Sequence, residues 1–254
     1  MTPSCPVFIS GVCYFASDFH LGAPNWELSN KRERLIISWL DYISKDADCL
    51  FLLGDIFDFW FEYKGKPPEC YKLFLNKIEE LRKKNIEIYF FTGNHDMWLK
   101  NYLQDQLGIH VFKKKQEFII NGKNFLIGHG DGLGKGEIGY KCLKFFLNCT
   151  INRWLFGLIP PKIGFALAHF FSKRSRAMTP EHQEIFWGKE KELLVQFCIQ
   201  YLVDHNIDYF IFGHRHLPIK ITIEKTIYFN TGDWLQYNTY IHYEKKPVLC
   251  YYNQ

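Results

Sequence analysis

Seven side chains of the kinds that bind divalent metals occur in five short segments of this 254-residue chain. They comprise two carboxylates, one amide and four imidazoles. The seven are Asp18, His20, Asp55, Asn94, His129, His214 and His216. Carboxylate and imidazole ligands without thiolate suit borderline divalent ions such as Mn, Fe or Zn, and they select poorly among them. The segments therefore predict a metal site with oxygen and nitrogen ligands.

The number of ligands indicates two ions. Seven ligands exceed what one tetrahedral ion takes. They suit two ions roughly 3.5–4 Å apart that share one carboxylate, as in two-metal hydrolases. Asp55 is the expected shared ligand because it ends the most apolar strand of the chain. Such a pair binds a phosphate through two oxygens and lowers the pKa of a water toward ~7, so the predicted chemistry is hydrolysis at phosphorus.

Short apolar strands are the elements that must bring these segments together. Residues 50–53 form an apolar run that stops at Gly54 and predicts a buried strand. The other four segments also follow apolar runs, and ligands bind at the carboxyl ends of strands in open α/β sheets. Each segment alone is also typical of a turn or a helix cap. Their occurrence together, each after an apolar run, favours a metal site.

The first half of the chain is expected to alternate strand and helix. Strands are predicted at 12–17, 50–53 and 86–91, with helices at 31–43 and after Pro67-Pro68. This β-α-β-α-β order is typical of a parallel sheet with right-handed crossovers.

Hairpins and helices are expected in the second half. Asn121-Gly122 between apolar runs suits a type I′ turn, and 219–231 predicts a second hairpin. A long helix is predicted from Thr179 to about Asp204, and closing strands within 240–251. No Ser/Gly/Pro-rich linker divides the chain, so we expect one domain over 1–254 that includes a helical cap insertion at about 137–176.

The composition narrows the class of protein. An apolar content of 47% with 18% aromatic residues excludes global disorder. The first basic residue is Lys31, so a positive secretory n-region is absent, and no apolar run has the length of a membrane span. The eight scattered cysteines contain no Cys-x-x-Cys pair and are expected to be reduced thiols. We expect a cytoplasmic protein.

The cap insertion combines positive charge with aromatic side chains. From 135 to 176 the sequence has eight basic residues and one acidic residue, a net charge of +7 where the whole chain carries +4. Its aromatic residues are Tyr140, Phe145, Phe146, Trp154, Phe156, Phe165, Phe170 and Phe171. This combination suits acyl chains with an anionic headgroup, or an anionic bilayer surface. The alternative is a helical hairpin that packs its aromatics on the core, and nucleic acid fits poorly because the basic residues alternate with apolar ones.

We expect this cap to form a lid over the metal site, because it lies between the ligands His129 and His214, which must converge. Phe146, Trp154 and Phe165 are expected to face an acyl pocket.

The motifs resemble those of a known family. The strings are Asp18-x-His20, Gly54-Asp55-x-x-Asp58, Gly93-Asn94-His95-Asp96, Gly128-His129-x-Asp131 and Gly213-His214-x-His216. Together they are similar to the calcineurin-like metallophosphoesterases over nearly the whole chain. The resemblance implies an α/β fold, a two-sheet sandwich flanked by helices with the metals at the strand ends.

The resemblance also implies a role for each ligand. One metal would be bound by Asp18, His20, Asp55 and His216, and the second by Asp55, Asn94, His129 and His214. His95, held by Asp96, matches the family's residue that steadies the phosphate and protonates the leaving group, which is general-acid chemistry.

Three longer strings are similar to one branch of the family. They are 18–24, 54–60 and 230–234. That branch cleaves the pyrophosphate of a lipid-linked nucleotide sugar in lipid A synthesis, typically with Mn²⁺, at the cytoplasmic side of the inner membrane. The proteobacterial enzymes have Arg where this chain has His95, so the chain resembles a second branch. The substrate contacts that the resemblance implies are Asn94, His95, Asp131, Arg174, Ser175, Arg176 and His214.

Two other functions stay open at this point. One is a generic phosphomonoesterase or phosphodiesterase that acts on a soluble substrate, which the apolar cap disfavours. The other is a non-catalytic scaffold of the same fold, which would not need all seven ligands and His95.

Overall fold

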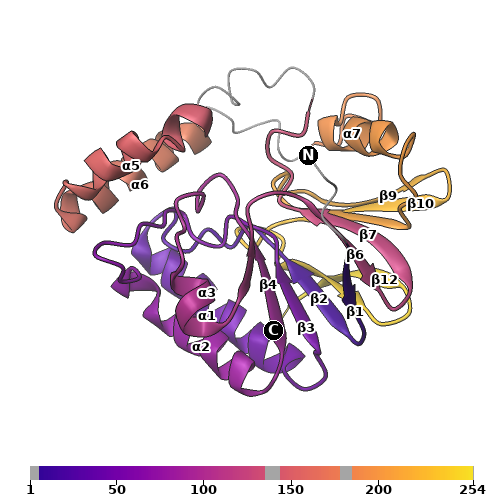
Figure 1. The fold of residues 1–254 in the computed structure, drawn as a ribbon, viewed down its shortest axis with the longest axis horizontal. Coiled ribbons are helices and arrows are strands. Elements are labelled where there is room, and N and C mark those ends of the chain that lie inside the picture. The colour runs from indigo at the N-terminus through magenta and orange to yellow at the C-terminus, as the bar shows by residue number, and fades with distance from the viewer. Residues whose placement is uncertain (1–5, 135–143, 178–184, 254) are drawn as a thin grey trace.

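Two six-stranded sheets form the centre of the molecule. The computed structural model describes residues 6–134, 144–177 and 185–253 (Figure 1). In spatial order, the first sheet is β1 (Val7–Ile9), β6 (Gln116–Ile120), β7 (Lys123–Gly128), β8 (Tyr209–Phe212), β10 (Thr226–Thr231) and β9 (Pro218–Ile223). The second is β12 (Pro247–Tyr251), β11 (Thr239–Tyr243), β2 (Cys13–Ala16), β3 (Cys49–Leu52), β4 (Glu87–Phe91) and β5 (His110–Phe112).

The two sheets pack on each other through aromatic side chains. Strands β2 to β5 run parallel, and their register places Phe15 beside Phe51 and Phe51 beside Tyr89. These rings stack at 4.6 and 4.7 Å between centroids and meet Phe118 and Phe125 of the other sheet. Alternate residues of the same strands face helices on the outer side. Both faces are therefore buried, which explains the uninterrupted apolar runs in the sequence.

Helices cover the outer faces of both sheets (Figure 1). The helices beside the second sheet are α1 (Trp26–Ile43), the 3₁₀ turn η1 (Glu69–Tyr71), α2 (Lys72–Lys83) and α3 (Tyr102–Leu107). Helix α7 (Leu193–Tyr201) packs Leu194, Val195 and Cys198 on the first sheet. The arrangement is helix, sheet, sheet, helix, which confirms the predicted α/β sandwich.

Local sequence signals explain the start of α1 and the turns of two hairpins. Helix α1 begins earlier than predicted because the side chain of Asn25 accepts a hydrogen bond from the amide of Leu28. Asn121 and Gly122 both have positive φ, so the predicted type I′ hairpin between β6 and β7 is confirmed. The hairpin of β9 and β10 is confirmed as well.

The long helix predicted from Thr179 to Asp204 is wrong. Thr179 lies outside the described residues, residues 185–188 have no regular structure, and α7 begins at Leu193. Gly188 has φ +93°, a left-handed conformation that a right-handed helix cannot contain, so the helix cannot begin before it.

The cap lies at one end of the molecule and is helical where it is described. Residues 144–147 are helical, and α5 (Thr150–Gly157) and α6 (Pro161–Ala177) follow. Figure 1 shows α5 and α6 beyond the end of α1 and α2. Within the described residues, we find no helix with the length and apolarity needed to cross a membrane.

Candidate metal centre

The seven predicted ligands meet where five strands end. Asp18 and His20 follow β2, Asp55 follows β3, and Asn94 follows β4. His129 follows β7, and His214 and His216 follow β8, so both sheets contribute. Backbone hydrogen bonds join the loops: the amides of Asp18 and His20 donate to the carbonyls of Gly54 and Asp55 at 3.0 and 2.9 Å.

Five of the seven residues have a left-handed backbone conformation. Asp18, His20, Asp55, His214 and His216 have φ between 44° and 68°. This conformation costs about 1–3 kcal/mol for a residue with a side chain, and such residues cluster at ligand clamps. The surrounding hydrogen bonds hold these turns and direct the side chains inward.

Gly54 permits the close approach of these loops. It has φ +89°, and a Cβ added to it would lie 2.7 Å from both the amide nitrogen of Gly93 and Nδ1 of His129. Any other residue would push the loops after β4 and β7 away from Asp55. The Gly-Asp string at the end of β3 is therefore a packing requirement of the site.

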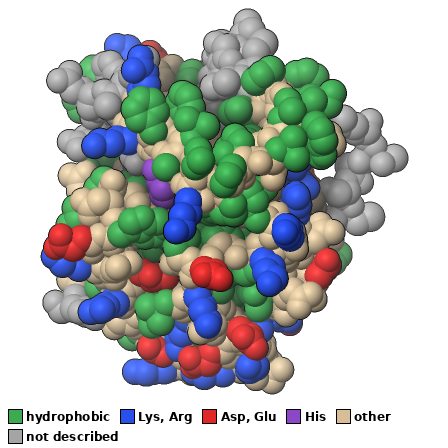
Figure 2. Space-filling model, turned by 90° about the vertical axis from the view of Figure 1, so that its left-hand side faces the viewer, with side chains coloured by type: hydrophobic (Ala, Val, Ile, Leu, Met, Phe, Trp, Pro, Cys, Tyr) green, Lys and Arg blue, Asp and Glu red, His purple; other side chains and the backbone are tan. Residues whose placement is uncertain are grey.

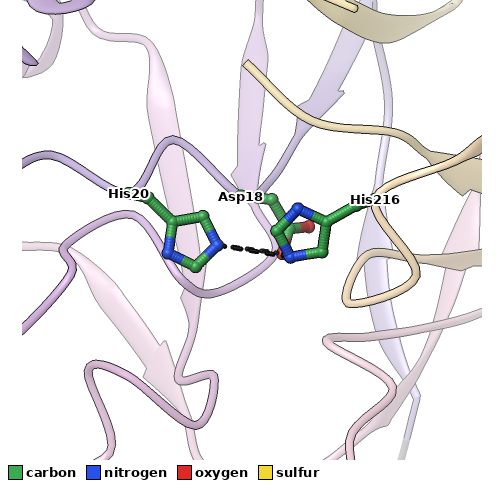
Figure 3. Close-up of side chains that lie close together, drawn as sticks. All are labelled: Asp18, His20 and His216. Carbon is green, nitrogen blue, oxygen red and sulfur yellow. Dashed lines mark hydrogen bonds and ion pairs between the residues drawn. The ribbon is translucent and has the colours of Figure 1, made fainter. Parts of the chain in front are cut away.

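One cluster consists of Asp18, His20 and His216, whose ring nitrogens and carboxylate point toward one another (Figure 3). Nε2 of His216 lies 3.3 Å from Oδ1 of Asp18, and Nε2 of His20 lies 3.7 Å from the same oxygen. The two Nε2 atoms are 3.4 Å apart. Asp18 and His20 are buried.

A second cluster consists of Asp55, His129 and His214. Nε2 of His129 lies 3.3 Å from Oδ2 of Asp55 and 3.3 Å from Oδ1 of Asn94. The same Asp55 oxygen lies 3.9 Å from Nε2 of His20 in the first cluster. Asp55 therefore stands between the clusters, as expected of a shared ligand.

The hydrogen bonds around the clusters fit metal ligation. Nδ1 of His129 donates to the carbonyl of Leu53 at 2.7 Å, and Nδ1 of His216 lies 3.1 Å from Oδ2 of Asp233. Such partners direct the Nε2 lone pair into the site. Oδ1 of Asp18 is buried and has no hydrogen-bond partner among the described residues. A buried carboxylate oxygen faced by two imidazole nitrogens fits a divalent cation.

Electrostatics favour ionised carboxylates in the site. Burial opposes ionisation of Asp18, but nearby imidazoles, His216 first, lower its pKa to about 2. Burial opposes ionisation of Asp55 as well, yet His129 holds its pKa well below the usual range. The carboxylates raise the pKa of His129 to about 10 against the effect of burial. The positive charge that keeps these carboxylates ionised is here that of the neighbouring imidazoles, and a bound divalent cation would take its place.

His95 lies beside the clusters and is held by Asp58. Its Nδ1 lies 3.0 Å from the Asp58 carbonyl oxygen and 3.6 Å from Oδ1 of Asp58. Its ring meets that of His20 edge-on at 4.8 Å. Burial lowers the pKa of His95.

Asp96 was expected to hold the ring of His95, but its carboxylate binds backbone amides instead. Its carboxylate accepts hydrogen bonds from the amides of Gly93 and Ile56 at 2.6 and 2.9 Å, and burial raises its pKa to about 7. It therefore shapes the loop after β4.

The remaining predicted substrate contacts lie on cap helix α6 and on the segment between β7 and the cap. Asp131 forms an ion pair with Lys144. Arg174 is exposed on α6, and the side chains of Ser175 and Arg176 lie outside the described part of the chain.

Sequence reasoning missed two cap residues that touch the site. His169 and Ser172 of α6 both donate to the carboxylate of Asp58. With Phe165 they occupy positions i, i+4 and i+7 of one helical face. This spacing was the signal available in the sequence. In the structure, Phe165 packs against Phe59 at 5.3 Å between ring centroids, so this face of α6 is the one that meets the core.

The cap aromatics divide between two sides of the helices. Phe165 packs on Phe59, and Phe156 packs on Phe61 and Trp98, so they face the core. Phe146 and Trp154 are 61% and 64% exposed. The expectation that Phe165 faces an acyl pocket with those two is therefore wrong.

A sandwich of two sheets with paired carboxylate–imidazole clusters at its strand ends defines a metal-dependent phosphoesterase. The family model of the calcineurin-like phosphoesterases matches residues 13–218, and the chain belongs to that family. It is a metal-dependent hydrolase, and the family's dependence on two metal ions agrees with the two clusters around Asp55.

Relatives within the family share one name. A UDP-2,3-diacylglucosamine hydrolase of Porphyromonas gingivalis is 33% identical over 241 residues, which cover 89% of this chain and 92% of the relative. The UDP-2,3-diacylglucosamine hydrolase of Actinobacillus succinogenes is 26% identical, over 80% of this chain and 83% of the relative. The UDP-2,3-diacylglucosamine hydrolase of Psychromonas ingrahamii is 22% identical, over 92% of this chain and 94% of the relative.

Proposed function

We propose that this chain hydrolyses the pyrophosphate bond of UDP-2,3-diacylglucosamine and releases 2,3-diacylglucosamine 1-phosphate (lipid X) and UMP, a step of lipid A biosynthesis. The observation that carries the proposal is the 33% identity to a UDP-2,3-diacylglucosamine hydrolase over nearly the full length of both chains. The apolar and basic cap beside the metal clusters supports the same substrate.

Two divalent ions, Mn²⁺ in this proposal, would occupy the clusters. Asp18, His20, Asp55 and His216 would hold one, and Asp55, Asn94, His129 and His214 the other. When bound, such a pair supplies Lewis-acid chemistry that polarises the phosphate and activates water. The chain's own contribution is to hold the seven proposed ligands at the strand ends, four of them buried, and to keep Asp55 within reach of both clusters.

His95 is the proposed general acid. Its Nδ1 is occupied by the carbonyl of Asp58, so Nε2 is the nitrogen available to the leaving group. Asn94 and His214 would contact the substrate phosphates from the metal side. Asp131, Arg174, Ser175 and Arg176 stay as predicted substrate contacts on the cap side.

The outer surface of the cap suits a lipid. Apolar side chains exposed on it include Phe145, Phe146, Ile151, Trp154, Leu158, Ile163, Phe170 and Phe171. Figure 2 shows hydrophobic side chains gathered in the upper half of the face at the cap end of the molecule, with lysine and arginine among them. Exposed apolar surface of this kind marks a binding site, and nearby cations attract anionic headgroups. We propose that the cap binds the acyl chains and contacts the cytoplasmic face of the inner membrane peripherally.

The test is incubation of the purified protein with UDP-2,3-diacylglucosamine and Mn²⁺, followed by mass measurement of the products. The proposal predicts lipid X and UMP, and no products after chelation. Asp55→Asn protein is the matched inactive control. A preparation that cleaves soluble phosphodiesters but leaves the lipid intact would contradict the proposal and favour a generic phosphodiesterase.

A further inference from the structure

The inner edge of cap helix α6 meets the core at one buried carboxylate, that of Asp58. Oγ of Ser172 donates to Oδ1 of Asp58 at 2.7 Å, and Nδ1 of His169 donates to Oδ2 at 3.0 Å. Each carboxylate oxygen thus receives a donor from the cap.

The core provides a socket for the ring of His169. Gly22 has φ +106°, and a Cβ added to it would lie 2.9 Å from Cε1 of His169. The ring of Trp26 meets His169 edge-on at 5.4 Å. Gly22 belongs to the loop that begins with Asp18 and His20, so the socket is part of the segment that builds the first metal cluster. A larger residue at position 22 would displace the helix.

The same contact reaches His95. Oγ of Ser172 lies 3.3 Å from Nδ1 of His95, while that nitrogen also lies 3.0 Å from the carbonyl oxygen of Asp58. The His95 N–H can therefore donate toward both oxygens, and the Ser172 hydroxyl donates onward to Asp58. Ser172 is buried. The hydroxyl thus adds a contact from the cap to the same ring nitrogen that the carbonyl of Asp58 holds.

We propose that His169 and Ser172 are positioning residues: they dock α6 on Asp58 and hold the ring of His95 in place. The cap then takes part in hydrolysis of every substrate, including small ones that do not touch its apolar outer surface. The inference rests on the proposed role of His95 and is independent of the identity of the lipid. We expect loss of either partner to lower activity about 10–100-fold, the scale known for residues that orient metal ligands.

A double-mutant cycle with His95 tests the proposal on a soluble phenyl phosphodiester, whose leaving group needs a proton. Ser172→Ala should lower kcat about 10–100-fold with metal content retained. In the His95→Ala background the same change should cause no further loss, because the ring it positions is gone. Lys173→Ala, an exposed neighbour on α6, is the matched control and should leave kcat unchanged.

His169 supplies a second test that does not depend on Ser172. His169→Ala should lower kcat in the same way, and His169→Asn, which keeps an N–H donor near the position of Nδ1, should restore most of the loss. An equal loss from Ser172→Ala with and without His95, or full activity of Ser172→Ala and His169→Ala, would overturn the proposal. Wild-type turnover in the His95→Ala protein would show that His95 is not the general acid. The assay with the lipid substrate would still test the proposed substrate separately.

Discussion

The strand-end loops and the cap helices both carry functional side chains, but they hold them in different ways. In the loops, four of the seven proposed ligands are buried, five have left-handed backbone conformations, and backbone hydrogen bonds join neighbouring loops. In the cap, the inner edge of α6 forms a few polar bonds with the core, while the outer surface exposes Phe146 and Trp154. The loops are built for a fixed geometry. The cap combines a hydrogen-bonded inner edge with an exposed apolar outer surface.

This difference separates chemistry from substrate choice. Changes in the loops should affect all substrates, because every substrate needs the metals. Changes on the outer surface of the cap should affect the lipid alone. Substitutions at the edge where α6 meets Asp58 should lower activity on all substrates, as substitutions in the loops do, although these residues lie in the cap.

The largest effect is expected from Asp55→Asn. The change removes one anionic ligand from both clusters, so metal occupancy should fall and hydrolysis of lipid and soluble substrates should drop to background. The fold should persist, since Asp55 lies in a loop beyond β3. Metal analysis, circular dichroism and turnover measure this, with the exposed Asp105→Asn as the matched control. Wild-type turnover in the Asp55→Asn protein would contradict a shared ligand.

His95→Ala should have the next largest effect. Loss of a general acid lowers kcat by about 10²–10⁴-fold, and metal content should be retained because His95 is not a predicted ligand. His110→Ala, an exposed histidine that pairs with Glu87, is the control. A loss of metal that parallels the loss of kcat would instead identify His95 as a ligand.

Arg32→Met should weaken metal binding indirectly, by removing support from the backbone of the loop that carries Asp18 and His20. The buried Arg32 of α1 donates to the carbonyls of Phe19 and His20 at 2.7 and 2.6 Å and so fixes the loop that holds Asp18 and His20. Loss of such support costs about 10–100-fold in metal affinity. Titration with Mn²⁺ measures the affinity, and added Mn²⁺ should restore turnover. Unchanged affinity would show that the loop keeps its form without the guanidinium.

The smallest effect, and the most selective, is expected from Phe146→Asp with Trp154→Asp. A charge on the outer cap surface should lower kcat/KM for the diacylated substrate about tenfold, which corresponds to roughly two buried methylenes at ~0.8 kcal/mol each. Turnover of a soluble phosphodiester should stay unchanged. Val203→Asp, an exposed apolar residue outside the cap, is the control. If both substrates lost activity equally, the outer surface would have no role in lipid binding.

The proposed ligands could be predicted from the sequence because each follows an apolar run. Such runs mark strands that are buried on both faces of a sheet. The sequence also placed the Asn121-Gly122 turn, where positive φ at both residues demands those residue types. The helix expected from Thr179 was predicted from a start signal alone, and it failed because the left-handed conformation of Gly188 stops a right-handed helix. A start signal does not show how far a helix continues, and Gly188 was not weighed against it.

Long-range contacts were beyond the sequence. Phe146 and Phe165 are equally apolar, yet one is exposed and the other packs on Phe59, since the choice depends on what the helix lies against. His169 and Ser172 lie 111 and 114 residues from Asp58 along the chain. Their importance appears once α6 is placed on the core, and the sequence directed attention to Arg174, Ser175 and Arg176 instead.

The most direct test of a shared-ligand, two-metal site is the number of ions each chain binds. Apoprotein equilibrated with Mn²⁺ should bind two ions per chain, and activity should rise in step with occupancy of the two sites. Asp55→Asn should lower binding at both sites together, because its carboxylate lies between both clusters. Full activity with one ion per chain, or loss of a single site in Asp55→Asn, would contradict the account.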